Sequence, residues 1–187
     1  MKTCSLSRTH FLLAQLLILA SLAPGQAGAQ DVSAGLKEAY FRAVGEHFQL
    51  PLQEVTIVGE WELAPEEVPV VLFLADRAGV SPDALAGLRR SGRPWMEVAT
   101  GFGLGAAAFH LPLPEGEPLG VLERACGEFR TRPAREWTQI QLTDPEVITL
   151  VNLRVLAERA GVPPIRVLRA REEAGSFMAA YPLLRGG

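Results

Sequence analysis

Apolar residues recur at helical spacing along most of the chain and predict a mainly α-helical fold. The segment 33–48 carries its apolar side chains on one side of an amphipathic helix. The segment 144–160 is far more apolar, so we expect its helix to be central and buried on most sides. Asn152 is the polar exception within that segment, and a buried amide would need hydrogen-bond partners there.

An internal repeat runs through the chain. Leu74–Met96 aligns with Leu156–Met178 without a gap, at a constant offset of 82 residues, and nine of the 23 positions are identical. In the first copy these positions are Leu74, Ala75, Arg77, Ala78, Gly79, Val80, Pro82, Arg89 and Met96. Composition alone would give roughly one or two identities. We therefore interpret the match as a duplicated structural unit.

Each copy predicts a helix-turn-helix-turn-helix unit. The two pseudo-equivalent repeats cover about residues 63–99 and 142–181, and a proline-rich linker at 111–118 lies between them. Thr143 and Glu146 have the spacing of a capping box at the start of the second unit.

Glycine and proline mark the first turn of each unit. Gly79 and Gly161 suit the left-handed position that ends a helix. Pro82 and Pro164 suit the first residue of the helix that follows. The four positions therefore predict two equivalent helical corners.

Two short segments favour extended structure. Val55–Val58 is rich in β-branched residues, and Thr138–Leu142 resembles a strand in the same way. Because each segment precedes one repeat, the two could pair as a short two-stranded β ribbon. The run 68–75 could also form a buried strand, but its longer counterpart in the second copy favours a helix.

Residues 1–29 have the pattern of a secretory signal peptide. Lys2 and Arg8 precede the apolar run Phe11–Ala23, and small residues follow at 27–29. The run has 13 residues, whereas a membrane-spanning helix needs about 20. We expect export to the periplasm or secretion, with no membrane span after cleavage. Retention of the segment as an N-terminal anchor is the alternative.

Removal of that segment changes the charge. The full chain has 187 residues, 18 basic and 21 acidic side chains, and a net charge of −3. Residues 30–187 number 158, and they keep 16 of the basic and all 21 of the acidic side chains, which gives −5. This length suits a single helical domain. The hydrophobic content of 48% excludes a disordered chain.

One local pattern resembles bacterial helix-turn-helix modules. Leu74–Leu85 is similar to the turn of such repressors, and Leu88–Leu104 is similar to their glycine-spaced helix that follows. The resemblance implies DNA binding as an alternative function. The acidic balance and the export signal disfavour a nucleic acid partner, because phosphate neutralisation needs a basic face.

A second pattern covers most of the chain beyond residue 29. The segments 68–75, 142–147 and 161–164 resemble those of a set of small exported bacterial proteins of unassigned function. This resemblance implies export and a helical repeat fold. It implies no substrate, cofactor or catalytic residue.

The chain beyond residue 29 is poor in reactive side chains. It holds one cysteine, Cys126, and two histidines, His47 and His110, far apart in sequence. No zinc spacing, phosphate-binding loop or nucleophile motif is present, so we expect no metal, cofactor or catalytic site. Cys126 is interpreted as a buried hydrophobe; an intermolecular disulfide and a reactive thiol are its alternatives.

Four residues are candidates for interaction sites. Arg77 and Arg159 each sit in a last helical turn, where a cation complements the helix dipole. A pseudo-symmetric anion or partner site is the alternative. Trp95 and Phe177 occupy matching positions and are interpreted as core aromatics. A recognition patch for a peptide or cell-wall ligand is their alternative.

Together these features predict an exported envelope protein that acts as a non-catalytic binding or structural partner. Its ligand would be another envelope protein or a cell-wall component. An envelope enzyme with an unidentified site and a DNA-binding module are the alternatives. A pocket of convergent ionisable groups would favour the enzyme, and an exposed apolar patch would favour the binder.

Overall fold

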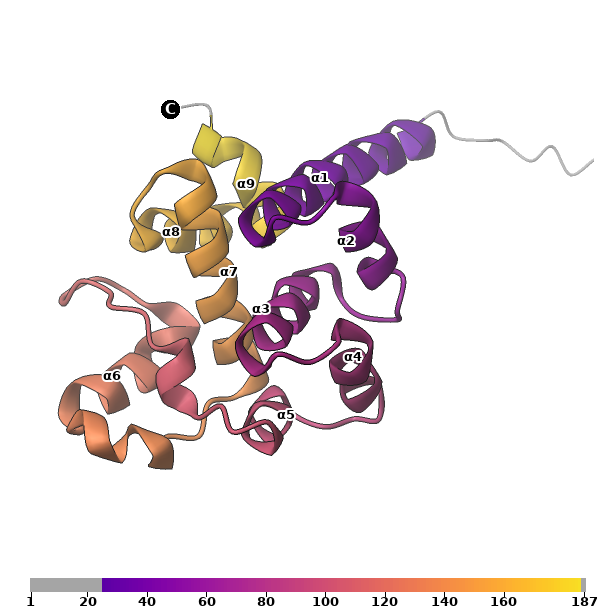
Figure 1. Ribbon diagram of the computed structural model, residues 1–187. Helices are drawn as coiled ribbons and strands as arrows, with labels where there is room; N and C mark the ends of the chain where they lie inside the picture. Colours follow the sequence, from indigo (N-terminus) through magenta and orange to yellow (C-terminus); the bar gives the residue numbers. More distant parts are fainter. Residues whose placement is uncertain (1–24, 186–187) are drawn as a thin grey trace, which may run out of the picture.

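The computed structural model describes residues 25–185, which contain nine α-helices, four short 3₁₀ helices and no strand (Figure 1). The α-helices are α1 (Gly25–Phe48), α2 (Leu52–Gly59), α3 (Val68–Ala78), α4 (Pro82–Arg90), α5 (Trp95–Gly101), α6 (Glu123–Thr131), α7 (Asp144–Ala160), α8 (Pro164–Ala174) and α9 (Phe177–Arg185). The 3₁₀ helices are η1 (Pro65–Glu67), η2 (Ala106–Phe109), η3 (Gly120–Leu122) and η4 (Ala134–Gln139). The predicted mainly helical fold is confirmed.

Helix α7 is the centre of the molecule. It packs against α1, α3, α5, α8 and α9, and ten of its 17 residues are buried. Figure 1 shows α7 between α3 on one side and α8 on the other, with α1 across its end. The apolar pattern of residues 144–160 therefore predicted both the helix and its central position.

Asn152 has the buried environment and the partners expected of it. Its Oδ1 accepts a hydrogen bond from the Tyr40 hydroxyl of α1. Its Nδ2 donates to the carbonyl of Glu66 at 2.9 Å and to that of Ile148 at 2.8 Å. Burial, and then the charge of Glu66, raise the pKa of Tyr40 well above its ordinary value. Asn152 thus connects α1, η1 and α7 through one satisfied amide.

The predicted helix ends at the first turns are confirmed. Gly79 and Gly161 both have φ 66° and ψ 33°, the left-handed conformation that ends α3 and α7. Pro82 and Pro164 are the first residues of α4 and α8. Glycine is favoured at the two left-handed positions because it lacks the Cβ that makes this conformation strained.

Buried glutamates stand at the starts of α3 and α7. The Glu67 carboxylate accepts from the backbone N–H of Ala64 at 3.1 Å. The Glu146 carboxylate accepts from the Thr143 backbone N–H at 2.7 Å and its hydroxyl at 3.0 Å. Glu67 is 8% exposed and Glu146 is 2% exposed. Each carboxylate therefore satisfies a free donor ahead of its helix.

The proposed β ribbon is wrong within the described residues. Val55–Val58 lies inside α2, with Val55 and Val58 buried. That spacing of three places both valines on one helical face, so packing overrides their β propensity. Residues 138–139 belong to η4, and residues 140–142 continue without strand pairing.

The N-terminal helix boundary differs from expectation, whereas the linker agrees with it. Helix α1 begins at Gly25 rather than at Ser33, so residues 25–29 of the predicted signal peptide lie in its first turns. Residues 1–24 of that segment lie outside the described residues. Beyond the linker, the chain forms η3 and then α6. The linker 111–118 is without helix, as predicted.

The buried side chains form one hydrophobic cluster that extends from Tyr40 to Leu184. No helix within residues 25–185 combines the length and the apolar character needed to cross a membrane. The helices are therefore held together by a common core. A functional site is to be sought in the hollows on the surface between helices.

Candidate functional site

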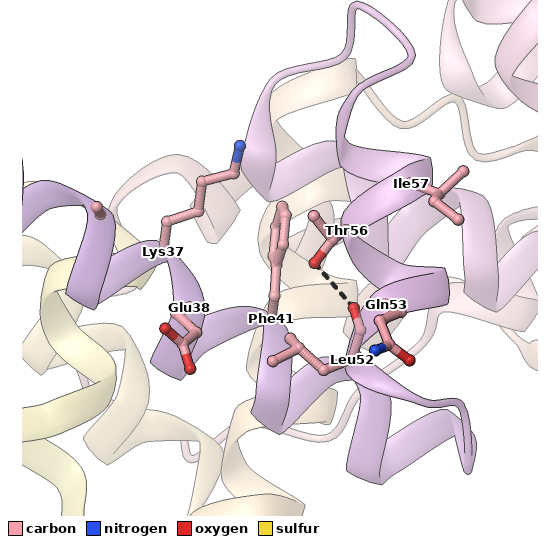
Figure 2. A pocket seen from close by; sticks show the side chains of 8 residues that line it. Lys37, Glu38, Phe41, Leu52, Gln53, Thr56 and Ile57 are labelled. Carbon is pink, nitrogen blue, oxygen red and sulfur yellow. Dashed lines mark hydrogen bonds between the residues drawn. The ribbon is translucent and has the colours of Figure 1, made fainter.

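A hollow of about 590 Å³ opens between α1 and α2. Figure 2 shows it from close by, and we call it the α1–α2 groove. The side chains that line it are Ala34, Lys37, Glu38 and Phe41 from α1, and Leu52, Gln53, Thr56 and Ile57 from α2. Within each helix these residues follow one another at intervals of one or three positions, so each set forms a single stripe.

Phe41 forms the base of the groove. Figure 2 shows its ring standing between the two helices, with Lys37 and Glu38 on the α1 side. The Lys37 Nζ lies 5.2 Å from the centroid of the Phe41 ring, within cation–π distance. The Thr56 hydroxyl donates to the Leu52 carbonyl at 2.8 Å, so its proton is used within α2. The base is therefore apolar, and the charges lie at the rim.

A glycine in α2 allows the Phe41 ring to occupy this place. A Cβ at Gly59 would lie 2.5 Å from the ring of Phe41, closer than side-chain contacts allow. At the other end of the helix pair, a Cβ at Gly45 would lie 2.7 Å from the Leu50 carbonyl oxygen. The shape of the groove thus depends on the absence of a Cβ at Gly45 and at Gly59.

Ile57 separates this groove from a second apolar hollow of about 360 Å³. The second hollow is bordered by Leu50, Trp61 and Leu72 among others, and Ile57 lines both. The exposed fraction of Ile57 is 52%, which is high for a large apolar residue. Two adjoining apolar hollows with an exposed isoleucine between them form a surface typical of a protein-binding site.

The candidate aromatics Trp95 and Phe177 lie in the core, with exposed fractions of 0% and 1%. The Arg89 guanidinium lies 5.1 Å from the Trp95 ring, and the Arg171 guanidinium lies 5.7 Å from the Phe177 ring. The Trp95 indole Nε1 also donates to a Glu67 oxygen at 3.1 Å. Both aromatics therefore have structural partners inside the protein.

Arg89 is committed to protein carboxylates. Its Nε donates to Glu67 at 2.7 Å, and its Nη1 donates to Asp144. Burial alone would lower the pKa of Arg89, but the hydrogen bonds to Asp144 and Glu67 raise it above its ordinary value. This basic side chain of α4, in the segment that resembles a helix-turn-helix module, is used within the fold.

Carboxylates also serve the first backbone donors of α5 and α9. The Trp95 N–H donates to Asp144, from the start of α7, at 2.7 Å. The Phe177 N–H donates to Glu66, from η1 ahead of α3, at 2.5 Å. Helix α5 is thus capped by an acid from the start of α7, and α9 is capped by an acid that precedes α3, so the segments 65–101 and 144–185 are tied together.

The candidate arginines Arg77 and Arg159 are not brought together. Arg159 donates to Glu46 of α1 at 2.7 Å. The Arg77 guanidinium lies 4.9 Å from the centroid of the Phe73 ring and borders a separate, polar hollow. The two positions match in sequence, yet they face different neighbours.

Sequence reasoning missed that His110 and Cys126 line the same small hollow of about 190 Å³. The His110 ring packs against Trp137 and Phe129, with centroid distances of 4.4 and 5.0 Å. Burial raises the pKa of the Cys126 thiol, and burial with Arg154 lowers the pKa of His110. A protonated thiol beside a neutral imidazole matches the interpretation of Cys126 as a buried hydrophobe. His110 and Cys126 are 16 positions apart in the sequence, and no sequence motif indicates that they line one hollow.

Within residues 25–185, no group of three or more His, Cys, Asp or Glu side chains is arranged to hold a metal ion. Comparison of the chain with protein-family models, with curated proteins and with solved structures gives no match. The function is therefore inferred from the residues and the structure of this chain.

Proposed function

We propose that the protein is an exported component of the bacterial envelope that binds an apolar helix of a partner protein, without catalysis of its own. The observation that carries the proposal is the α1–α2 groove, with Phe41 at its base and the exposed Ile57 at its edge. Export is supported by the signal-peptide pattern of residues 1–29.

A helix is the occupant that suits this groove best. Two helices that face each other with one stripe each leave a furrow, and an amphipathic helix can fill it with residues spaced by three and four positions. Lys37 and Glu38 would give the contact a polar rim of mixed charge around an apolar centre. Since the rim carries both signs, we expect the apolar residues of the partner to supply most of the affinity.

The same proposal includes two pseudo-equivalent helical units as the scaffold. It is supported by the nine identities, by the equal backbone angles of Gly79 and Gly161, and by the exchanged carboxylate caps of α5 and α9. An experimental structure tests it by superposition of residues 74–96 on 156–178. Closely matching Cα traces are expected, and unrelated crossing angles at the two corners would contradict duplication.

Export has a direct test. The chain produced in a bacterial host should appear in the periplasm or the medium, and N-terminal sequencing should find Gln30 as its first residue. Unprocessed protein confined to the cytosol would overturn export and would return the DNA-binding alternative to consideration.

The groove is tested with a photo-crosslinking amino acid placed at Gln53, which lines it. The matched control carries the same amino acid at Arg135, whose side chain is 81% exposed in η4. We expect one discrete heterologous adduct from position 53, its loss in an Ile57→Glu background, and no such adduct from position 135. An adduct between two copies of this chain, one to its own residues 1–24, or equal adducts from both positions would contradict a partner helix.

A further inference from the structure

A polar hollow of about 380 Å³ lies between the end of α1, α3 and α7, and it shares no lining residue with the α1–α2 groove. Its charged side chains come from two helices that are distant in sequence. Asp76 and Arg77 belong to α3, whereas Arg154 and Glu158 belong to α7. His47, near the end of α1, completes the wall. Folding therefore gathers five ionisable side chains around one small space. This is the arrangement that would favour the enzyme alternative, so that alternative has its location here and not at the α1–α2 groove.

The two arginines share one aromatic ring. The guanidinium carbons of Arg77 and Arg154 lie 4.9 and 5.1 Å from the centroid of Phe73. Arg154 donates to the backbone carbonyl of His110 at 2.7 Å, which fixes the position of its guanidinium. Burial, and then the charge of Arg77, lower the pKa of Arg154. Two cations thus lie against one aromatic ring, and each is near enough to line the hollow.

Within the part of the chain that the structure describes, no carboxylate neutralises either arginine at ion-pair distance. Other arginines of the molecule do form such pairs, as Arg159 does with Glu46. Arg77 and Arg154 therefore differ from Arg159 in having unpaired charge that faces a hollow. An anionic group of a ligand would complement that charge.

Two carboxylates border the same space. Among residues 25–185, Asp76 makes no ion pair, and Glu158 lies only near His47, with 3.4 Å between its oxygen and Nδ1. That Nδ1 is buried and has no hydrogen-bond partner among the described residues. Burial lowers the pKa of His47, so the imidazole is mainly neutral at pH 7 and leaves the Glu158 charge uncompensated. The hollow thus presents separate positive and negative groups.

We infer that this hollow binds a small zwitterion, an amino acid or a short peptide, in addition to the partner helix of the α1–α2 groove. The ligand carboxylate would contact Arg77 and Arg154, and its ammonium group would contact Asp76 and Glu158. Unpaired charges of both signs at one hollow favour a ligand that carries both. A simple anion such as phosphate would gain from the arginines but would be repelled by the two carboxylates.

Calorimetric titration of the purified protein tests the inference with four organic ligands and with inorganic phosphate. Dialanine and free alanine carry both charges and separate a peptide from an amino acid. N-acetyl-dialanine lacks the ammonium group, and dialanine amide lacks the carboxylate. We expect at least one zwitterion to bind, and each single-charge analogue to bind at least tenfold more weakly than dialanine if the peptide is the ligand. If free alanine is the better ligand, N-acetylalanine and alanine amide replace them.

Variants then assign the binding to this hollow. Arg77→Gln and Asp76→Asn change exposed side chains, so folding should be preserved, and each should weaken binding about tenfold or more. Arg159→Gln is the matched control, because it occupies the equivalent position but is paired with Glu46; its affinity should equal that of the unmodified protein.

Three results would overturn the zwitterion site. They are no binding of either zwitterion, equally tight binding of an analogue that lacks one charge or of inorganic phosphate, and an equal loss in the control variant. The photo-crosslink from Gln53 should persist in Arg77→Gln, because the groove and the polar hollow share no residue. The two proposals can therefore fail separately.

Discussion

The starts of α5 and α9 follow the same plan but differ in one functional group. Each begins with a buried aromatic residue, Trp95 or Phe177, whose ring lies beneath an arginine of the preceding helix. Trp95 brings an indole N–H into the core, and Glu67 accepts it. Phe177 has no such donor. The buried carboxylate thus accompanies the aromatic that needs an acceptor.

This difference changes the role of the arginine. Arg89 donates to Glu67 and Asp144, so its charge is compensated. Arg171, its counterpart over Phe177, has a buried Nε without a hydrogen-bond partner among residues 25–185. One start is therefore a network of coupled charges, and the other is an apolar contact with an arginine above it. The same backbone arrangement therefore occurs both with a fully paired arginine and with one whose buried Nε has no partner among residues 25–185.

The largest expected effect is removal of the aromatic side chains. Trp95→Ala and Phe177→Ala should each lower the free energy of unfolding by about 3–5 kcal/mol, because both leave a cavity in a closed core. Trp95→Ala should cost more, since it also removes a donor from Glu67. Urea unfolding of both variants measures the difference, and a greater cost for Phe177→Ala would contradict the comparison.

The arginines come next. Arg89→Met should lower the free energy of unfolding by about 3 kcal/mol, because it leaves Glu67 with its negative charge buried and less compensated. Arg171→Met should cost less than about 1 kcal/mol, the range of a cation–π contact without an ion pair. Equal costs in urea unfolding would show that the two starts use their arginines in the same way.

The caps should have a smaller effect. Asp144→Ala and Glu66→Ala each remove the acceptor of one helix-start N–H, which typically costs about 1 kcal/mol. Asp144→Ala should cost more than Glu66→Ala because Asp144 also accepts from Arg89. Thermal unfolding compares the pair, and an Arg89→Met background should bring the two costs closer together.

The smallest expected effect is the dependence of stability on pH. It should be the same for the start of α5 and the start of α9. Burial lowers the pKa of His47 and of His110, so the folded protein binds fewer protons than the unfolded chain. Their contribution to stability is complete above the ordinary histidine value of 6.5 and is lost as the pH falls below it. Melting curves at several pH values should show this loss, and His47→Gln with His110→Gln should reduce it.

The sequence predicted those parts of the fold that depend on local backbone chemistry. Gly79 and Gly161 had to end helices because few other residues adopt their conformation, and Asn152 had to find partners because its surroundings were apolar. Val55–Val58 was wrong as a strand because β-branched residues also suit a helix when the core lies every third or fourth position. The packing of α2 against α1, and not the local β propensity, determined that this segment is a helix.

The candidate site was less predictable. Arg77 was identified as a possible anion ligand, but Arg154 lies 77 positions further along and carries no motif. The stripes of α1 and α2 that form the groove resemble ordinary core-facing stripes. Whether another helix covers such a stripe depends on how the whole chain packs, and that information is not local to either segment.

Cys126 can serve as a chemical probe of local opening in the core. It is the only cysteine within residues 25–185, it is 5% exposed, and burial raises its thiol pKa. A thiol-reactive dye should therefore modify Cys126 slowly, and faster when α6 and the linker 111–118 move apart. The rate of that modification, in protein without residues 1–29 and hence without Cys4, reports how often this part of the core opens.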